Sequence, residues 1–259
     1  MTHDAVFYLV LAVAVTILGL SKGGFAGIGM VSTPLVAAFS DPLTAAGLML
    51  PVMMVQDPVA VFLYRRSFDR SLLRRMLPGA VLGVALAYVF AASVPEWSVQ
   101  AVLGVLSLGF ALWQLAILRR GVPDLPPVPR FDRVLGLLSG AGSGFSSAIA
   151  HAGSPPFQIY VMPRHLPKEV YVGTSVMFFA ATNVMKVPSF AALGLFRSDL
   201  LALSVLYMPL AVFSSWLGVR LVRYVDVQRF NVIITLILLL IGLSLLWQSA
   251  ADLSAWWHR

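Results

Sequence analysis

Eight long apolar segments make up most of this chain, and they constrain its fold more than any other feature. They span residues 5–39, 43–64, 72–92, 97–118, 134–163, 169–193, 200–219 and 230–250. A helix that crosses a hydrocarbon core needs ~20 apolar residues, and backbone in lipid must satisfy its own hydrogen bonds. Hydrophobic residues form 59% of the chain and charged residues 11%, which excludes a soluble domain. The sequence predicts an all-α polytopic membrane protein.

Two of these segments are too long for one span and are broken in the middle. Residues 5–39 contain Gly23 and Gly24 directly after Lys22. Residues 134–163 are broken by Gly140, Gly142 and Gly144 and then by the run His151-Ala152-Gly153-Ser154-Pro155-Pro156, and the piece after the prolines is too short to cross alone. We predict that each segment is a re-entrant helical hairpin, which enters the membrane and leaves on the same side. Irregular backbone at membrane depth needs cover from protein or a water-filled cavity, so the hairpin tips are the expected substrate site.

The two predicted hairpins begin two similar halves, residues 1–118 and 134–259, which a polar, proline-rich cytoplasmic linker at 119–133 joins. The turn at 68–73 reads Phe-Asp-Arg-Ser-Leu-Leu, and the turn at 196–201 reads Phe-Arg-Ser-Asp-Leu-Leu. A helix with an early proline, Pro78 or Pro209, is expected after each turn. We predict two repeats, each consisting of a re-entrant hairpin and three transmembrane helices.

The distribution of Lys and Arg favours the hairpins, because short cytoplasmic loops are enriched in these residues. With two hairpins, fourteen of them fall on the cytoplasmic side, and only Arg197 and Arg259 fall outside. With eight single crossings the split would be eleven against five. The hairpin arrangement places both termini outside the cytoplasm and gives the halves opposite orientations. Secondary transporters with such inverted repeats have substrate sites near the midplane, at broken helices.

Three charged residues lie in the interior of apolar segments, away from the segment ends, namely Lys22, Asp57 and Lys186. Charge at bilayer depth is costly, and such residues usually face a bundle interior or a transport pathway. Pro58 follows Asp57 and Pro188 comes shortly after Lys186, so both helices are expected to bend there. A structural ion pair between Asp57 and a lysine, which would lock the halves together, is the alternative to a functional role.

The broken geometry favours an anionic substrate over a cation or a neutral lipid. The second arm of each hairpin begins near mid-membrane, so its N-terminal amides and the positive end of its dipole should point into a cavity. Lys22 and Lys186 add full positive charges. Thr182 and Asn183 could donate hydrogen bonds to an anion, although such groups in membrane helices also bond to neighbouring helices.

His151 is the only histidine inside an apolar segment. It could pack through a hydrogen bond, carry a proton or contact the substrate, and the sequence leaves these roles open. Neither a second histidine nor a carboxylate stands at ligand spacing, so we predict no metal site and no cofactor. The chain has no cysteine, which excludes disulfides and thiolate chemistry.

Two other functions are considered as alternatives. An intramembrane serine protease would need a serine activated by a histidine, and Ser143 and Ser146 lie close to His151. The Gly-x-Ser-Gly motif of rhomboid-like proteases is not met, because Ala141 stands at its first position. A non-transporting membrane assembly protein is the second alternative. We expect no nucleic-acid partner, since the net charge of +7 is accounted for by cytoplasmic loops.

Long motifs in both halves resemble the sulfite exporter TauE/SafE family. They are Gly173-Thr174-Ser175-Val176-Met177-Phe178-Phe179, Thr182-Asn183-Val184-Met185-Lys186-Val187-Pro188, Ala150-His151-Ala152-Gly153-Ser154-Pro155-Pro156 and Gly19-Leu20-Ser21-Lys22-Gly23-Gly24-Phe25. The resemblance implies a carrier in the inner membrane that exports sulfite or organosulfonates such as sulfoacetate, coupled to ion gradients. Ser154 departs from the family pattern, since many members have a glycine there.

These inferences combine into one expected mechanism, alternating access of two inverted halves around a central anion site. The residues expected to hold the anion are Lys22, Gly23, Gly24, Ser154, Asn183 and Lys186. Asp57 and His151 are the candidate proton-handling groups. The expected partners are a small sulfur-containing anion and the lipid bilayer, and the sequence does not determine an oligomeric state.

Overall fold

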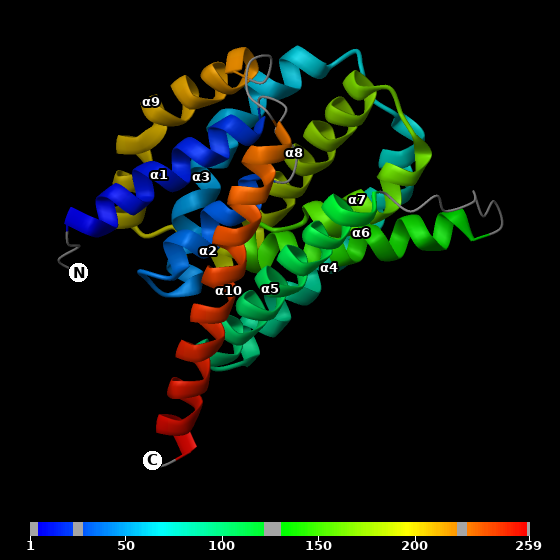
Figure 1. The fold of residues 1–259 in the computed structure, drawn as a ribbon. Coiled ribbons are helices and arrows are strands. Elements are labelled where there is room, and N and C mark those ends of the chain that lie inside the picture. The colour runs from blue at the N-terminus through cyan, green and yellow to red at the C-terminus, as the bar shows by residue number, and fades with distance from the viewer. Residues whose placement is uncertain (1–4, 23–27, 122–130, 222–226, 258–259) are drawn as a thin grey trace.

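The computed structural model describes residues 5–22, 28–121, 131–221 and 227–257, and within them the chain is all-helical and contains no strand (Figure 1). The α-helices are α1 (Ala5–Lys22), α2 (Ser32–Ala37), α3 (Pro42–Tyr64), α4 (Arg70–Ser93), α5 (Glu96–Arg120), α6 (Asp132–Ala150), α7 (Ser154–Val161), α8 (Lys168–Ala192), α9 (Ser198–Leu221) and α10 (Val227–Trp257). Two short 3-10 helices are η1 (Ile28–Val31) and η2 (Met162–Arg164). The predicted all-α fold is confirmed.

In the described part of the chain, seven helices are long and apolar enough to cross a membrane, and they are α1, α3, α4, α5, α8, α9 and α10. Large apolar side chains stand on the outer surface. Leu86, Leu206, Leu240 and Trp247 are between 61% and 79% exposed. Such a surface is unfavourable in water and favourable in lipid. The protein is therefore a multi-pass membrane protein. Helix α1, which the sequence analysis assigns to a hairpin, is itself of spanning length.

The segment that begins with α6 reverses direction at His151 and returns through α7. His151 adopts the left-handed backbone conformation (φ 53°, ψ 23°), which ends α6. Helix α7 then starts at Ser154 and packs against α6. At the far end, Arg164 of η2 forms an ion pair with Asp132, the first residue of α6. The beginning and the end of this segment therefore lie side by side.

The first-half segment has a related arrangement. Helix α1 is followed by η1 and the short helix α2, and both contact α1. Residues 23–27, which connect α1 to η1, lie outside the described residues. The chain enters α3 at Asp41, whose carboxylate accepts a hydrogen bond from the Thr44 amide at 2.7 Å and caps the helix.

Three helix boundaries recur at a constant spacing of 128 residues. Helices α1 and α6 end at Lys22 and Ala150, α3 and α8 end at Tyr64 and Ala192, and α4 and α9 begin at Arg70 and Ser198. The turns at 68–73 and 196–201 thus start helices at equivalent positions. Pro78 and Pro209 lie inside these helices, as the sequence predicts.

Glycines allow two pairs of helices to cross closely. Between α4 and α6, a Cβ atom at Gly79 would lie 2.0 Å from the Leu137 carbonyl oxygen, and one at Gly140 would lie 2.0 Å from the Met76 carbonyl oxygen. Between α1 and α9, a Cβ atom at Gly19 would lie 2.8 Å from a backbone nitrogen of α9. Small residues at such contacts let membrane helices approach closely enough to pack backbone against backbone.

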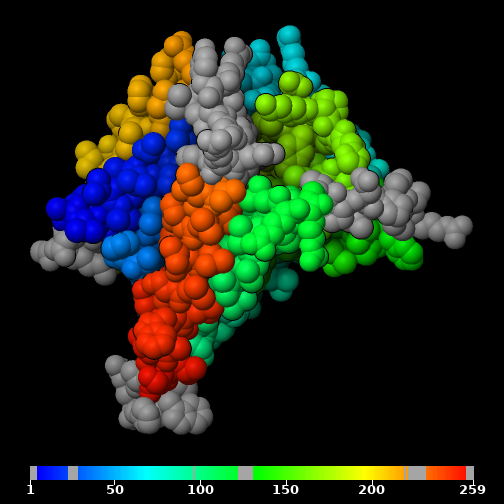
Figure 2. Space-filling model, in the orientation of Figure 1, coloured from blue at the N-terminus to red at the C-terminus, as the bar shows by residue number. Residues whose placement is uncertain are grey.

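Helices α5 and α10 pack along each other at one edge of the molecule. A Cβ atom at Gly242 would lie 2.9 Å from the Leu108 backbone nitrogen, so this contact is also close. The last turns of α10 project beyond the other helices (Figure 1 and Figure 2). Because α5 comes from the first half and α10 from the second, this contact joins the two halves.

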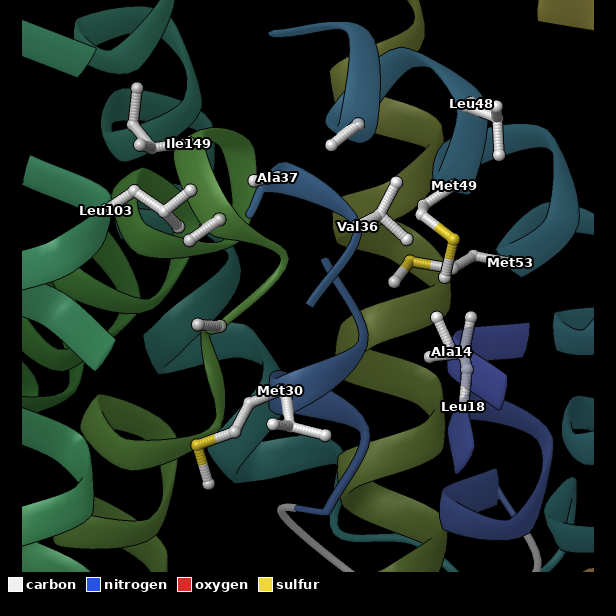
Figure 3. Packing of buried hydrophobic residues seen from close by; sticks show 14 of the residues in the cluster. Ala14, Leu18, Met30, Val36, Ala37, Leu48, Met49, Met53, Leu103 and Ile149 are labelled. Carbon is white, nitrogen blue, oxygen red and sulfur yellow. The ribbon is translucent and has the colours of Figure 1, made fainter. Parts of the chain in front are cut away.

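The largest hydrophobic cluster also contains residues from both halves. In Figure 3, Leu18 of α1 and Met53 of α3 lie on one side of this cluster, and Leu103 of α5 and Ile149 of α6 lie on the other. Met30 of η1 lies between them. The broken first segment is therefore packed in the centre of the protein.

Replacing Gly79 with alanine should destabilise the protein, because the new methyl group would overlap the α6 backbone. Overpacking of this kind costs about 1–3 kcal/mol, so the thermal unfolding midpoint of Gly79→Ala should fall clearly in detergent. The matched control is Gly109→Ala in α5, where a Cβ atom would meet nothing within 4 Å. It should be neutral or stabilising, since alanine is the better helix former. Equal losses in both variants would contradict the close α4–α6 crossing.

Candidate functional site

The two broken segments meet at one cavity of about 80 Å³, which has room for several water-sized groups. Its walls come from α1, η1 and α3 of the first half and from α6, α7 and α8 of the second. The lining residues are Leu18, Ser21, Lys22, Gly29, Met30, Met53, Ser147, His151, Ser154, Val172, Ser175, Val176, Phe179 and Asn183. Four predicted site residues, Lys22, His151, Ser154 and Asn183, are thus brought together.

Asp57 joins the two halves beside this cavity. Its carboxylate forms an ion pair with the Lys22 ammonium through Oδ1, and it accepts a hydrogen bond from Asn183 Nδ2 through Oδ2 at 2.6 Å. The side chains of Lys22 and Asp57 are only 13% and 8% exposed. The ion pair considered in the sequence analysis is therefore present, but both charges belong to the first half. The connection to the second half is made by Asn183.

Lys186 is completely buried, and it is not among the residues that line the cavity. Its ammonium donates to Ser147 Oγ at 3.2 Å and to the Ser147 carbonyl oxygen at 3.3 Å. Ser147 itself lines the cavity, so Lys186 acts on the cavity through this residue. The Thr182 hydroxyl donates to the Phe178 carbonyl oxygen at 2.8 Å within its own helix. Of the polar residues in the turn before Lys186, Asn183 alone lines the cavity.

His151 lies at the cavity with an unsatisfied imidazole ring. The residue is 8% exposed, and neither Nδ1 nor Nε2 has a hydrogen-bond partner among the described residues. The ring meets Phe190 edge to face with a centroid distance of 6.0 Å. A buried polar group without a partner costs free energy. A polar ligand in the cavity would supply the missing hydrogen bonds.

Ser154 starts α7 at the cavity wall, and it is followed by two prolines. Because Pro155 and Pro156 have no N–H group, Ser154 provides the only amide in the first three positions of this helix. The hydroxyl and the amide of Ser154 are therefore the polar groups that this helix end offers. The Ser143 hydroxyl of α6 donates to the Gly153 carbonyl oxygen and so stabilises the turn between α6 and α7.

The structure also places residues that the sequence analysis did not assign to the site. Ser21, Ser147 and Ser175 line the cavity. Ser21 precedes Lys22, and Ser175 lies in the quoted glycine-threonine-serine motif, so both had a signal in the sequence. Ser147 had none, because a serine in a helix usually bonds to its own backbone. Gly23 and Gly24 lie outside the described residues.

The charges around the cavity suit an anion. Two lysines face one carboxylate here, which leaves an excess of positive charge in a largely buried environment. Electrostatic interactions are stronger where water is excluded. The hydroxyl groups of Ser147 and Ser154 can each donate one hydrogen bond to an oxyanion, whereas the Ser21 hydroxyl donates to the Leu18 carbonyl oxygen at 2.7 Å. His151, Ser175 and Asn183 add further polar groups to the wall, and the apolar lining residues include Leu18, Met30, Met53 and Phe179.

The geometry does not favour the other chemistries considered. A serine protease needs its serine hydroxyl bonded to a histidine, whereas Ser143 donates to a carbonyl oxygen and Ser146 donates to the Gly142 carbonyl oxygen at 2.7 Å. In the described ranges, no three His, Asp or Glu side chains come together as metal ligands would.

Comparison with known proteins identifies one family. A family model described as Sulfite exporter TauE/SafE matches residues 11–245, which is nearly the whole chain. Neither a search of curated proteins nor a search of solved structures gives a match.

The Lys22–Asp57 ion pair should behave as a coupled unit in stability measurements. Lys22→Met and Asp57→Leu each leave one largely buried charge without a partner, which costs about 3–5 kcal/mol. The double variant should recover most of this loss, as a double-mutant cycle of thermal unfolding would show. The control is the exposed pair of Arg197 and Asp199, 2.8 Å apart, where Arg197→Met should change the midpoint little. Additive losses at Lys22 and Asp57 would contradict the pairing.

Proposed function

We propose that this chain, which belongs to the sulfite exporter TauE/SafE family, is a secondary transporter that binds a small sulfur-containing anion in the cavity between its two halves. Sulfite and organosulfonates of the sulfoacetate kind are the proposed substrates. Export across the inner membrane is the proposed direction, in keeping with the family description. The protein would then be a permease and not an enzyme.

The observation that carries this proposal is the unsatisfied imidazole of His151 beside an excess of buried positive charge. Both ring nitrogens lack a partner in the described part of the chain, and both are buried. Lys22 and the Ser154 hydroxyl lie on the same cavity, and Lys186 reaches it through Ser147. A sulfur oxyanion would supply several acceptor oxygens to these groups. Ser154, in place of a glycine, would add one donor on the α7 side.

We further propose that the two halves are inverted repeats, each with a re-entrant hairpin. The constant spacing of 128 residues between equivalent helix boundaries supports the repeats. The helix contacts support them too, because α4 packs on α6 and the equivalent helix α9 packs on α1. For the second hairpin, the Asp132–Arg164 ion pair supports a return to the starting face. This arrangement places both termini outside the cytoplasm, with residues 1–118 and 134–259 as the two repeats.

Alternating access between these halves would expose the cavity to one face at a time. Asp57 is proposed to couple this movement to a proton. When its carboxylate is ionised, it holds Lys22 and Asn183. Protonation would weaken the ion pair and release the Lys22 ammonium toward the anion. His151 is the second proposed proton carrier, since a neutral imidazole has one nitrogen that accepts and one that donates.

Ligand binding should be visible as thermal stabilisation, because a ligand of the native state raises apparent stability. Sulfite, sulfoacetate and related sulfonates should raise the unfolding midpoint of the purified protein, while choline and other cations should not. Lys186→Met should abolish the response. The matched control is Lys168→Met, which removes an exposed lysine from the first turn of the same helix and should leave the response unchanged.

A second pair of variants isolates the imidazole. His151 and His165 both adopt the left-handed conformation, with φ of 53° and 47°, and glycine is the residue best suited to that region. His151→Gly should keep the fold and lose the anion response, whereas His165→Gly should keep both. In proteoliposomes, counterflow of labelled sulfite should likewise be lost in His151→Gly and retained in His165→Gly. An unchanged response in Lys186→Met and His151→Gly would overturn the proposed site.

A further inference from the structure

A second polar site, a groove, lies at the end of the α4–α6 contact, away from the central cavity. It has a volume of about 720 Å³ and is open to the outside. Arg70, Arg74 and Arg75 of α4 and Arg133 of α6 line it. Its inner wall is apolar and includes Val134 and Leu137. None of the residues that line this groove lines the central cavity.

Most of the positive charge in this groove is uncompensated. Arg74 and Arg133 are exposed and make no hydrogen bond or ion pair with any described residue. The Arg70 guanidinium lies 5.7 Å from the centroid of the Phe68 ring, and it forms no ion pair with a described residue. Arg70 and Arg74 are one turn apart, so they stand on the same face of α4. The groove therefore offers three guanidinium groups, of Arg70, Arg74 and Arg133, that have no ion-pair partner among the described residues.

The nearby carboxylates are already engaged. Asp132 forms ion pairs with Arg75 and Arg164, and of this cluster Arg75 lines the groove. Asp69, just before α4, accepts hydrogen bonds from the Ser71 and Leu72 amides at 2.8 Å and 3.1 Å. Neither α4 nor α6 carries another acidic residue. Within α4, α6 and the described turn before α4, an anion in the groove would therefore meet no free carboxylate.

The apolar side of the groove continues onto a lipid-facing surface. Val134 and Leu137 of the groove are 51% and 36% exposed. Leu138 and Leu82, on the same two helices, are 61% and 54% exposed. Arginines mark the start of both helices, at the place where membrane helices meet headgroups. A ligand that fits this combination has an anionic head and an apolar tail.

We propose that this groove binds the headgroup of an anionic phospholipid. Guanidinium groups bind phosphate oxygens in a bidentate manner, and basic pockets between membrane helices suit such headgroups. The bound phosphate would be held by Arg70 and Arg74 from the first half and by Arg133 from the second. The acyl chains would lie along Val134 and Leu137. The lipid would thus join α4 to α6 outside the Asp132 cluster.

This proposal does not depend on the transported substrate, and a titration of purified protein in neutral detergent tests it. Phosphatidylglycerol should raise the thermal unfolding midpoint in a saturable manner, whereas phosphatidylcholine should not. The Arg74→Gln/Arg133→Gln variant should need roughly fivefold more phosphatidylglycerol for each arginine removed to reach the same shift. Free glycerol phosphate should give no comparable shift, because it lacks the apolar tail.

The matched control is Arg65→Gln/Arg66→Gln, which removes the same charge from the neighbouring loop outside the groove. This variant should respond to phosphatidylglycerol like the unmodified protein. A loss of response as large as that of Arg74→Gln/Arg133→Gln would overturn the groove in favour of general surface electrostatics. Equal stabilisation by glycerol phosphate would overturn the lipid assignment. A full response from Arg74→Gln/Arg133→Gln would overturn the site altogether.

Discussion

The buried charges at the centre of this protein determine what the rest of the structure must do. A charge inside a membrane protein is tolerated only when a partner or a water-filled pathway compensates it. Lys22 is paired with Asp57, Asp57 is bonded to Asn183, and Lys186 is bonded to Ser147. These contacts join α1 to α3, α3 to α8 and α8 to α6, so each requires two helices to lie side by side at the buried charge. The broken segments and the central cavity follow from this requirement.

The close helix crossings hold that arrangement in place. Helix α6 carries Ser147 and leads to His151, and it is fixed against α4 by backbone contacts at Gly79 and Gly140. Helix α1 carries Lys22 and is fixed against α9 in the same manner at Gly19. Helices α1 and α6, two of the helices that bring polar groups to the cavity, are therefore each positioned by a partner helix. The α4–α6, α1–α9 and α5–α10 contacts each join a helix of one half to a helix of the other. A movement of one half would therefore change the cavity directly.

The sequence predicted the all-α fold and four of the residues that line the central cavity, because costly features are easy to recognise. Lys22, Asp57 and Lys186 stand out in apolar segments, and His151 with its following prolines interrupts a helix. Partner identities could not be predicted, since nothing in the sequence says which lysine pairs with Asp57. That Lys186 lies behind Ser147 depends on how α6 and α8 are rotated, and no local pattern records this. Serine is common in membrane helices, so its part in a cavity becomes visible only in three dimensions.

The central claim is that the segment from α6 to η2 enters the membrane and returns to the face from which it started. The chain has no cysteine, so single cysteines can be introduced at Phe131, Lys168 and Ser198, all exposed, and labelled with an impermeant maleimide in sealed vesicles of known orientation. The account predicts that positions 131 and 168 react from the same, cytoplasmic side, while position 198 reacts from the opposite side. Labelling of positions 131 and 168 from opposite sides would contradict it, because the segment would then cross the membrane.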